Sequence, residues 1–155
     1  MAQIPFYASG LRFSCKRCSK CCRYESGYVF LSEKDVKLLA AQLKMDNNGF
    51  IDTFCRWVPG DQGREFLSLK EKSNLDCIFW DLGCKVYNVR PVQCRTFPFW
   101  QSVVANSSSW EMAASGCPGI NSGEMHDENA ISAYIAQKNE EPTIIRKVRG
   151  DFDAY

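Results

Sequence analysis

The sequence has almost no net charge, no long hydrophobic run and a single histidine. Lys and Arg together number 19 and Asp and Glu 18, so no overall charge attracts the chain to nucleic acid or to a membrane surface. No apolar run reaches the roughly 18 residues of a membrane-spanning helix. The opening stretch MAQIPFYASGLRF lacks the basic region followed by an apolar region that marks a secretory signal. We therefore expect a cytoplasmic protein with no membrane partner.

Motifs for several enzyme classes are also absent. The chain has no P-loop, no GxGxxG fingerprint and no GxSxG elbow, so nucleotide binding and serine-hydrolase chemistry have no support. The histidine, His126, comes just before an expected helix, and we expect it to be a solvated surface residue rather than a metal ligand. Cys15 and Cys18 belong to a longer cysteine series, so a lone thioredoxin-type CxxC pair is not expected either.

Cysteine, by contrast, is abundant, with nine in 155 residues. A chain of this length forms one domain and buries about two thirds of its unfolded surface, so it does not need metal merely because it is small. The cytosol keeps thiols reduced, and an odd number of cysteines cannot be fully paired in disulfides. We therefore expect the cysteines to bind metal.

Four of the nine cysteines lie in residues 15–22, CKRCSKCC, which we call the cysteine ladder. Cys15, Cys18 and Cys21 follow C-x2-C-x2-C spacing, in which tight turns direct thiolates to one centre, as in zinc knuckles and iron–sulfur loops. Consecutive side chains leave a helix or a strand in different directions. We therefore expect Cys21 to complete the first set, and Cys22 to face a second centre or to bridge the two. Burial of Cys22 in apolar packing is the alternative.

Five cysteines lie further along the chain. Cys55 sits in an apolar run, TFCRWV, that we expect to be helical and buried, so we assign this thiol to the core. The other four are candidate ligands: Cys77, Cys84, Cys94 and Cys117. A thiolate centre is negatively charged whether it holds zinc or a [4Fe–4S] cluster, and nearby basic residues would offset either charge. Charge therefore does not decide between zinc and iron.

Three helices are predicted. Residues 30–49 begin with a capping box at Ser32 and Asp35 and end at the turn-forming pair Asn48-Gly49. Residues 50–60 form a second, shorter helix that stops at Pro59-Gly60. The third helix covers residues 127–141, is capped by Asp127, and has three apolar residues on one face: Ile131, Tyr134 and Ile135.

Strands are predicted where apolar residues alternate or form short runs. Residues 64–70, REFLSLK, form one strand of a hairpin, and residues 77–81, CIFWD, form a second strand or an extended segment. Residues 100–112 suggest a second hairpin around a serine-rich turn, while Pro91 and Pro98 prevent a long regular element between them. The fold class is a small, irregular α+β domain with a few helices and short hairpins, organised around cysteine-bound metal. We expect one domain over residues 1–155, with its core at about 13–123 and a mobile tail at 142–155.

The order of the motifs resembles a known family. The segments CKRCSKCC, CIFWDLGCKVYNVRPVQCRTFPFW and CPGI resemble the YkgJ-type cysteine-cluster family, which carries a CxxCxxCC zinc- or iron-chelating domain. The resemblance implies eight metal ligands: Cys15, Cys18, Cys21, Cys22, Cys77, Cys84, Cys94 and Cys117. It also implies supporting roles for five further residues: Tyr87, Arg90, Pro91, Arg95 and Pro98. Cys55 lies outside the pattern, which agrees with its assignment to the core.

Two classes of function are compatible with this resemblance. The first is a cytoplasmic metal-binding protein, of bacterial origin, in which zinc or an iron–sulfur cluster, [4Fe–4S] if the metal is iron, has a mainly structural or redox role. The second is an iron–sulfur-dependent enzyme of redox or protein methyl-transfer type, since some relatives resemble flagellin lysine N-methylases. No residues here identify a methyl-donor site, and catalytic residues stay unassigned. An unknown protein partner fits the first class, and the local basic patch RFSCKRCSKCCR is insufficient to predict a nucleic-acid partner.

Overall fold

Capping chemistry sets the first helix. The computed structural model describes residues 3–23 and 26–148. Helix α1 (Glu33–Gln42) begins at the predicted capping box, in which Ser32 Oγ accepts a hydrogen bond from the Asp35 N–H at 3.1 Å and Asp35 Oδ2 accepts one from the Ser32 N–H at 3.0 Å.

Helix α1 ends before the predicted position. Lys44 takes a left-handed φ of 56°, and Asp46 then caps a new helix, α2 (Asn47–Phe54), by accepting a hydrogen bond from the Gly49 N–H at 2.6 Å. Asn48-Gly49 therefore lies in the first turn of α2. The prediction that this pair ends the first helix is wrong. An aspartate that can cap a helix outweighs the turn preference of the residues after it.

The chain leaves α2 as a strand. Strands β2 (Cys55–Pro59) and β3 (Arg64–Leu69) form an antiparallel hairpin around the short helix η1 (Asp61–Gly63), with Cys55 opposite Leu69. The strand predicted at 64–70 and its hairpin are confirmed. The helix predicted at 50–60 is wrong from Cys55 onward, because these residues pair with β3 across the sheet. Strand β5 (Ile145–Lys147) adds to the other edge of β3, which gives the order β2-β3-β5.

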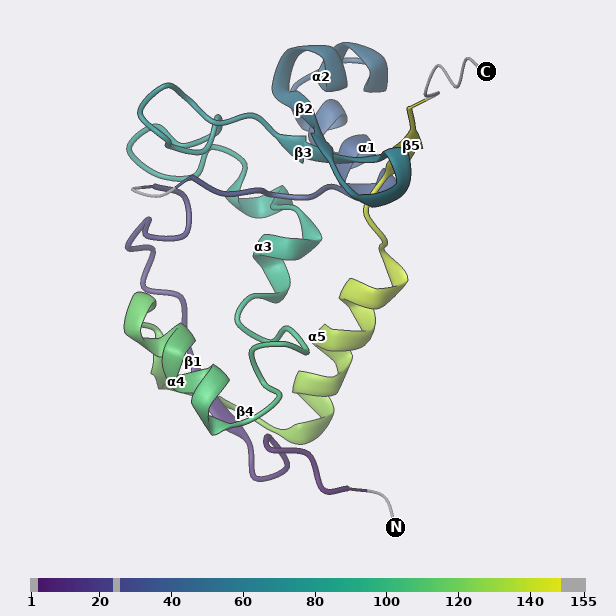
Figure 1. Cartoon of the computed structure of the whole chain (residues 1–155). Helices are drawn as coiled ribbons and strands as arrows, with labels where there is room; N and C mark the ends of the chain where they lie inside the picture. Colours follow the sequence, from purple (N-terminus) through teal and green to yellow (C-terminus); the bar gives the residue numbers. More distant parts are fainter. Residues whose placement is uncertain (1–2, 24–25, 149–155) are drawn as a thin grey trace.

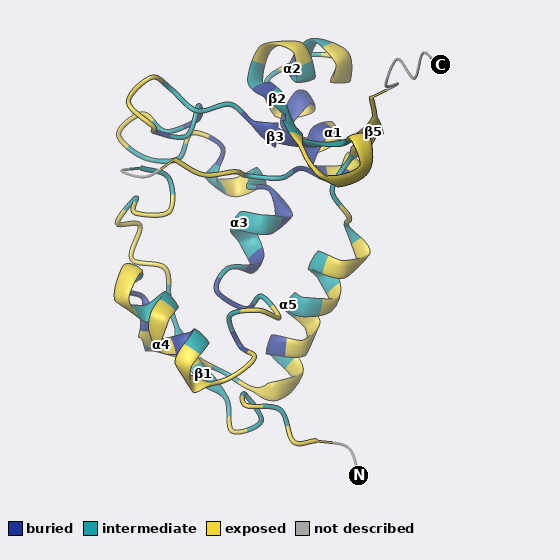
Figure 2. Cartoon of the chain, viewed as in Figure 1, coloured by how far each residue is buried: buried dark blue, intermediate teal, exposed yellow. Residues whose placement is uncertain are grey.

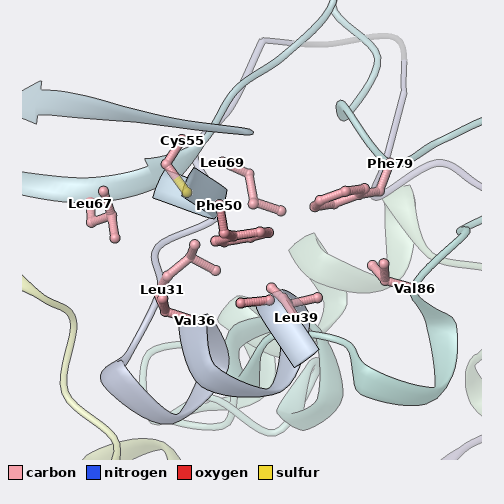
Figure 3. Close-up of a cluster of buried hydrophobic side chains, with 10 residues drawn as sticks. Leu31, Val36, Leu39, Phe50, Cys55, Leu67, Leu69, Phe79 and Val86 are labelled. Carbon is pink, nitrogen blue, oxygen red and sulfur yellow. The ribbon is translucent and has the colours of Figure 1, made fainter. Parts of the chain in front are cut away.

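The first hydrophobic core lies between this sheet and helices α1 and α2 (Figure 3). Phe50 and Phe79 stack with their ring centroids 6.2 Å apart, and Leu31, Leu39 and Leu67 are fully buried. Cys55 is only 6% exposed and packs in this cluster, so its prediction as a core residue is confirmed.

A second core lies at the other end of the molecule. It is enclosed by β1 (Leu11–Phe13), α4 (Ser107–Gly116), β4 (Ile120–His126) and α5 (Glu128–Glu140), and its buried residues are Phe99, Val104, Trp110, Ile120 and Ile131. The α5 prediction is confirmed, with Asp127 as cap and Ile131, Tyr134 and Ile135 packed on the cluster. The hairpin predicted at 100–112 is wrong, because Asn106 caps α4 and the serines form its first turn.

Helix α3 (Val92–Thr96) lies between these two halves, and α5 runs along one side of the molecule (Figure 1). Asp35 of α1 is 1% exposed, and its Oδ1 accepts a hydrogen bond from the Val92 N–H at 3.0 Å. Arg95 Nη2 lies 3.6 Å from Asp35 Oδ1 and 3.1 Å from Glu141 Oε2. These contacts tie α3 to α1 and to the end of α5.

The segment between β3 and α3 is irregular. The strand predicted at 77–81 is wrong: the chain turns there, with isolated bridges from Glu71 to Cys77 and from Trp80 to Cys84, followed by the short helix η2 (Tyr87–Val89). No long element crosses the proline-containing stretch, as predicted. Together the helices and the two small antiparallel sheets confirm the α+β class.

Figure 2 shows buried residues along α1, β3 and α3. Burial also corrects one residue prediction. His126 is half-buried and not solvated: its ring lies 4.9 Å from the Phe99 ring, and its Nε2 is 2.9 Å from the Phe13 carbonyl oxygen. β1 and β4, which were not predicted, bring these residues together. Of the tail, residues 145–147 form β5, while 149–155 lie outside the described residues. None of the helices in residues 3–23 and 26–148 has the length and hydrophobicity of a membrane span. A single domain over 1–155 stays a prediction.

Candidate metal centre

The cysteine ladder connects the two halves of the molecule. It follows β1 and runs along one edge toward the loops of residues 70–86 (Figure 1). The Ser14 N–H donates to the Gly119 carbonyl oxygen at 3.2 Å before the ladder, and the Cys77 N–H donates to the Cys22 carbonyl oxygen at 2.7 Å at its end. The ladder is therefore held by backbone hydrogen bonds at both ends. Cys15, Cys18 and Cys21 are exposed and Cys22 is half-buried.

The four later candidate ligands come from separate parts of the chain, and all four are half-buried: Cys77, Cys84, Cys94 and Cys117. Cys77 and Cys84 lie in the irregular segment, Cys94 is in α3, and Cys117 ends α4. A cavity of about 160 Å³ lies beside some of them, and four of its lining residues are Cys21, Cys22, Cys77 and Cys94. The fold thus brings two ladder cysteines and two later ones to one cavity. Cys84 lines a second cavity, of about 190 Å³, together with Arg17 and Tyr87.

The adjacent pair, Cys21 and Cys22, has its sulfur atoms 3.9 Å apart. Residues 19–22 form a turn in which the Cys22 N–H donates to the Ser19 carbonyl oxygen at 3.0 Å. The two side chains therefore do not diverge as they would in a helix or a strand. The hydrogen bond between the sulfurs lowers the pKa of Cys21 and raises the pKa of Cys22.

The charge of Cys21 affects the pKa of most of the other candidate metal ligands. Burial is the main cause that raises the pKa of Cys77, Cys84, Cys94 and Cys117, and the charge of Cys21 raises each of them further. The charge of Cys18 also raises the pKa of Cys117. Cys15 lies at the edge, where its sulfur accepts a hydrogen bond from the Arg17 N–H at 3.4 Å.

The side chains are neighbours without forming a ligand sphere. Within residues 3–23 and 26–148, no three Cys, His, Asp or Glu side chains lie close enough together to hold a metal ion. The exposed ladder contains no helix or strand. Its cysteine side chains would have to move toward the later cysteines to bind the same metal ion. Metal ligation by the eight cysteines therefore stays a prediction.

Positive charge surrounds these thiols. The hydrogen bond with Cys22 is the main cause that lowers the pKa of Cys21, and the charge of Arg90 lowers it further. Burial is the main cause that raises the pKa of Cys84 and Cys94, and the charge of Arg90 opposes this effect. Arg90 Nε is buried with no hydrogen-bond partner among the described residues, and Trp80 Nε1 is in the same state. Unpaired buried N–H groups are costly. An anionic centre beside them would give these donors a partner.

Comparison with known proteins identifies this cysteine arrangement. The family model CxxCxxCC, described as "Putative zinc- or iron-chelating domain", matches residues 14–118, which span the ladder, the irregular segment, α3 and Cys117. The chain belongs to this family. It is also 31% identical over 100 residues to an uncharacterized protein of Methanocaldococcus jannaschii, a match that covers 63% of this chain. The matched region spans 50% of that relative's length. No solved structure matches the chain significantly.

Five residues were predicted to support the cysteines, and the structure shows their contacts. Pro91 precedes the first turn of α3, and the bond between Phe97 and Pro98 is cis. Arg95 joins Asp35 and Glu141, as described above. Tyr87 and Arg90 stack on each other beside Cys84. Supporting roles for these residues in metal binding stay a prediction.

Several residues around the CxxCxxCC cysteines were missed from the sequence. Asp35 is buried and holds α3, which carries Cys94, but a capping-box aspartate has no local sign of a second partner 57 residues away. Arg17 and Arg23 were noted only as basic neighbours of the thiols, and each lies on an aromatic ring of the segment 77–90. Gly119 lies against the Ser14 carbonyl oxygen so closely that a Cβ atom would overlap it. The only available signal for Gly119 was its place in the CPGI motif.

Proposed function

We propose that this chain is a cytoplasmic metal-binding protein that holds zinc or an iron–sulfur cluster through the thiolates of the ladder and of the segment 77–117. The observation that carries the proposal is the shared cavity of Cys21, Cys22, Cys77 and Cys94, together with the backbone hydrogen bond that links Cys22 to Cys77. Cysteines from distant parts of the chain line this cavity, so metal bonds would cross-link the N-terminal segment to α3. Such a cross-link contributes directly to folding free energy.

The residues present fit a thiolate-bound metal. Thiolate is the ligand that zinc and iron–sulfur clusters share. Arg17 and Arg90 supply positive charge near the sulfurs, and aromatic side chains such as Phe97 and Trp100 form part of the cavity wall. A bound zinc ion would be structural, while a cluster would add the capacity to carry one electron.

The pair Cys21-Cys22 fits one centre better than the sequence suggested. Zinc–sulfur bonds of about 2.3 Å in a tetrahedron place two sulfurs about 3.8 Å apart. The observed separation of the two sulfurs is 3.9 Å. The pair can therefore act as two ligands of one ion, with Cys77 and Cys94 on the same cavity. Cys18 and Cys117 would contribute to a second centre, and Cys21 is the thiol next to both groups.

An iron–sulfur-dependent enzyme is the second candidate, and the size of the cavity favours it. A volume of about 160 Å³ exceeds what a single ion occupies, and the wall extends beyond the thiols to Tyr28, Gln93 and Trp100. A water molecule takes about 30 Å³ of liquid volume, so the cavity has room for a cluster or for a small ligand beside the metal. A cluster with an open coordination position would be required for catalysis.

The deciding experiment is anaerobic purification followed by metal analysis, sulfide analysis and an absorption spectrum. A colourless protein with zinc and no iron supports the structural zinc site and rejects the enzyme. A brown protein with iron and acid-labile sulfide supports the cluster and rejects zinc. A protein that holds no metal and stays equally stable in the presence of chelator contradicts the proposal.

A matched pair of variants locates the site. Cys77→Ala removes a thiol on the cavity, whereas Cys55→Ala removes a thiol in the first core. We expect the first variant to lose bound metal and the second to keep the metal content of the native chain. Equal metal content in the two variants would show that Cys77 is not a ligand.

A further inference from the structure

Two arginines of the ladder lie on aromatic rings of the segment that carries the later cysteines. The Cζ of Arg17 is 3.8 Å from the centroid of the Tyr87 ring, and the Cζ of Arg23 is 3.7 Å from that of Trp80. Arg23 Nε also lies 3.1 Å from Asp76 Oδ1. These two contacts bracket Cys18, Cys21 and Cys22 in the sequence. These side-chain contacts hold the ladder against the segment 76–90, in addition to the backbone hydrogen bond from the Cys77 N–H to the Cys22 carbonyl oxygen.

Tyr87 holds a second cation. The Cζ of Arg90 is also 3.8 Å from its ring centroid. A guanidinium stacked at this distance covers the ring, so Arg17 and Arg90 lie on opposite faces of Tyr87. The electron-rich faces of one aromatic ring attract both cations, although the two cations repel each other.

The charge of this stack is not neutralised by carboxylates. Within the part of the chain that the structure describes, neither Arg17 nor Arg90 forms an ion pair, whereas Arg146 on Trp57 is paired with Glu65. Arg17, Tyr87 and Cys84 line one cavity of about 190 Å³, so the stack lies beside a candidate metal ligand. The stack therefore presents positive charge to the cysteine cluster.

The backbone at Arg17 also needs this contact. Arg17 has φ of 51° and Ser19 has φ of 67°, in the left-handed region that residues other than glycine seldom adopt. Surrounding contacts must stabilise such a conformation. The stack on Tyr87 supplies one such contact for Arg17.

We propose that Tyr87 is a positioning residue of the metal centre, which holds Arg17 and Arg90 on its two faces, docks the ladder against the later cysteines and places two positive charges beside the anionic thiolates. This inference rests on the proposed function, because it assigns a role to Tyr87 within the same site. Tyr87 does not bind the metal; it acts through the ladder backbone and through the charge of the two arginines.

The test measures metal affinity and metal release in the full chain. Tyr87→Leu removes the aromatic face and Tyr87→Phe keeps it. Trp57→Leu is the matched control, since the Cζ of Arg146 lies 4.2 Å from the centroid of the Trp57 ring and Trp57 lines neither cavity that contains candidate ligands. Zn²⁺ affinity is measured by competition with a chromophoric chelator, or, for an iron–sulfur protein, the rate at which chelator bleaches the visible band is measured. We expect Tyr87→Leu to lose roughly tenfold or more in affinity or in resistance to bleaching, from two lost cation–π contacts. Tyr87→Phe and Trp57→Leu stay within about twofold of the native chain.

Each outcome of this test either supports or overturns the role of Tyr87. Native-like binding by Tyr87→Leu, or an equal loss in Trp57→Leu, overturns the role of Tyr87 while leaving the metal site in place. Failure of Tyr87→Phe to rescue overturns the cation–π explanation. If Tyr87→Leu does not fold, Arg17→Gln replaces it, because Arg17 is exposed and its loss leaves the ring in place. A native chain that binds no metal overturns the proposed function and this inference together.

Discussion

Replacing Asp35 by alanine should be among the most destabilising single substitutions in this protein. The side chain is 1% exposed, and its two oxygens accept hydrogen bonds from the backbone N–H groups of Ser32 and Val92, both at 3.0 Å. One bond belongs to the cap of α1 and the other fixes the first turn of α3. The substitution therefore separates the helix of the first core from the helix that carries Cys94.

The magnitude follows from these contacts. A hydrogen bond to a charged group contributes about 1.5–3 kcal/mol, so two of them give about 3–6 kcal/mol. Arg95 keeps Glu141 as a partner at 3.1 Å after the change, so it does not become an unpaired buried cation and adds little to the cost. We expect the free energy of unfolding to fall by about 3–5 kcal/mol, which corresponds to a melting temperature lower by on the order of 10 °C in a chain of this size.

Urea unfolding followed by circular dichroism measures this loss. Glu33→Ala is the control, because Glu33 is an exposed acidic residue in the first turn of the same helix, where its charge contributes only about 0.3–1 kcal/mol. If Asp35→Ala and Glu33→Ala differ by less than about 1 kcal/mol, the bond to Val92 does not hold α3 in place, and the reasoning is refuted.

Three further predictions concern the packing of Gly119, the packing of Cys55 and the removal of metal. Gly119→Ala should destabilise the protein by about 1–3 kcal/mol in thermal unfolding, because its Cβ would overlap the Ser14 carbonyl oxygen. Gly116→Ala, with no atom near the added Cβ, should be neutral or stabilising by up to about 1 kcal/mol, and an equal effect at both glycines would refute the clash. Cys55→Ala should cost about 1–2 kcal/mol through a core cavity while metal analysis finds an unchanged metal content; a lost metal ion would make Cys55 a ligand. Removal of the metal by chelator should lower the free energy of unfolding by about 2.7 kcal/mol, compared with protein kept at a free metal concentration of about 100 times the Kd. Identical unfolding curves with and without chelator would contradict a structural metal.

Local chemistry explains which parts of the fold were predictable. α1 and α5 begin at Ser32 and Asp127, whose side chains cap the helix within three residues, so the signal and the structure lie in the same short stretch. The strand at 64–70 was predictable because its apolar residues alternate. Cys55 shows the limit: the residues from 55 to 59, apolar apart from Arg56, suit a buried helix as well as a strand, and pairing with β3 decides between them.

The candidate site divides in the same way. The candidate ligands could be named from the sequence, because metal ligands are few in kind and the spacing within the ladder is local; their binding of metal stays a prediction. What surrounds them was not readable. Arg17 and Tyr87 are 70 positions apart, and neither residue type alone indicates a stacked pair. The pairing of β1 with β4, which moves His126 into the second core, likewise depends on contacts between the two ends of the chain.

The adjacent cysteines show how one local assumption changes the reading of a site. The expectation that Cys21 and Cys22 serve different centres depended on a regular backbone, in which neighbouring side chains diverge. The backbone here is a turn closed by the Ser19 carbonyl, and it leaves the sulfurs 3.9 Å apart on one cavity. Since that separation is close to the spacing of two thiolates on one tetrahedral ion, the pair is suited to act as a single two-sulfur clamp. Cys21, which also influences the thiols of Cys84 and Cys117, is then the residue through which a second centre would be coupled to the first. In the proposed site, the pair Cys21-Cys22 would form one group of ligands and the remaining ladder cysteines would belong to the other.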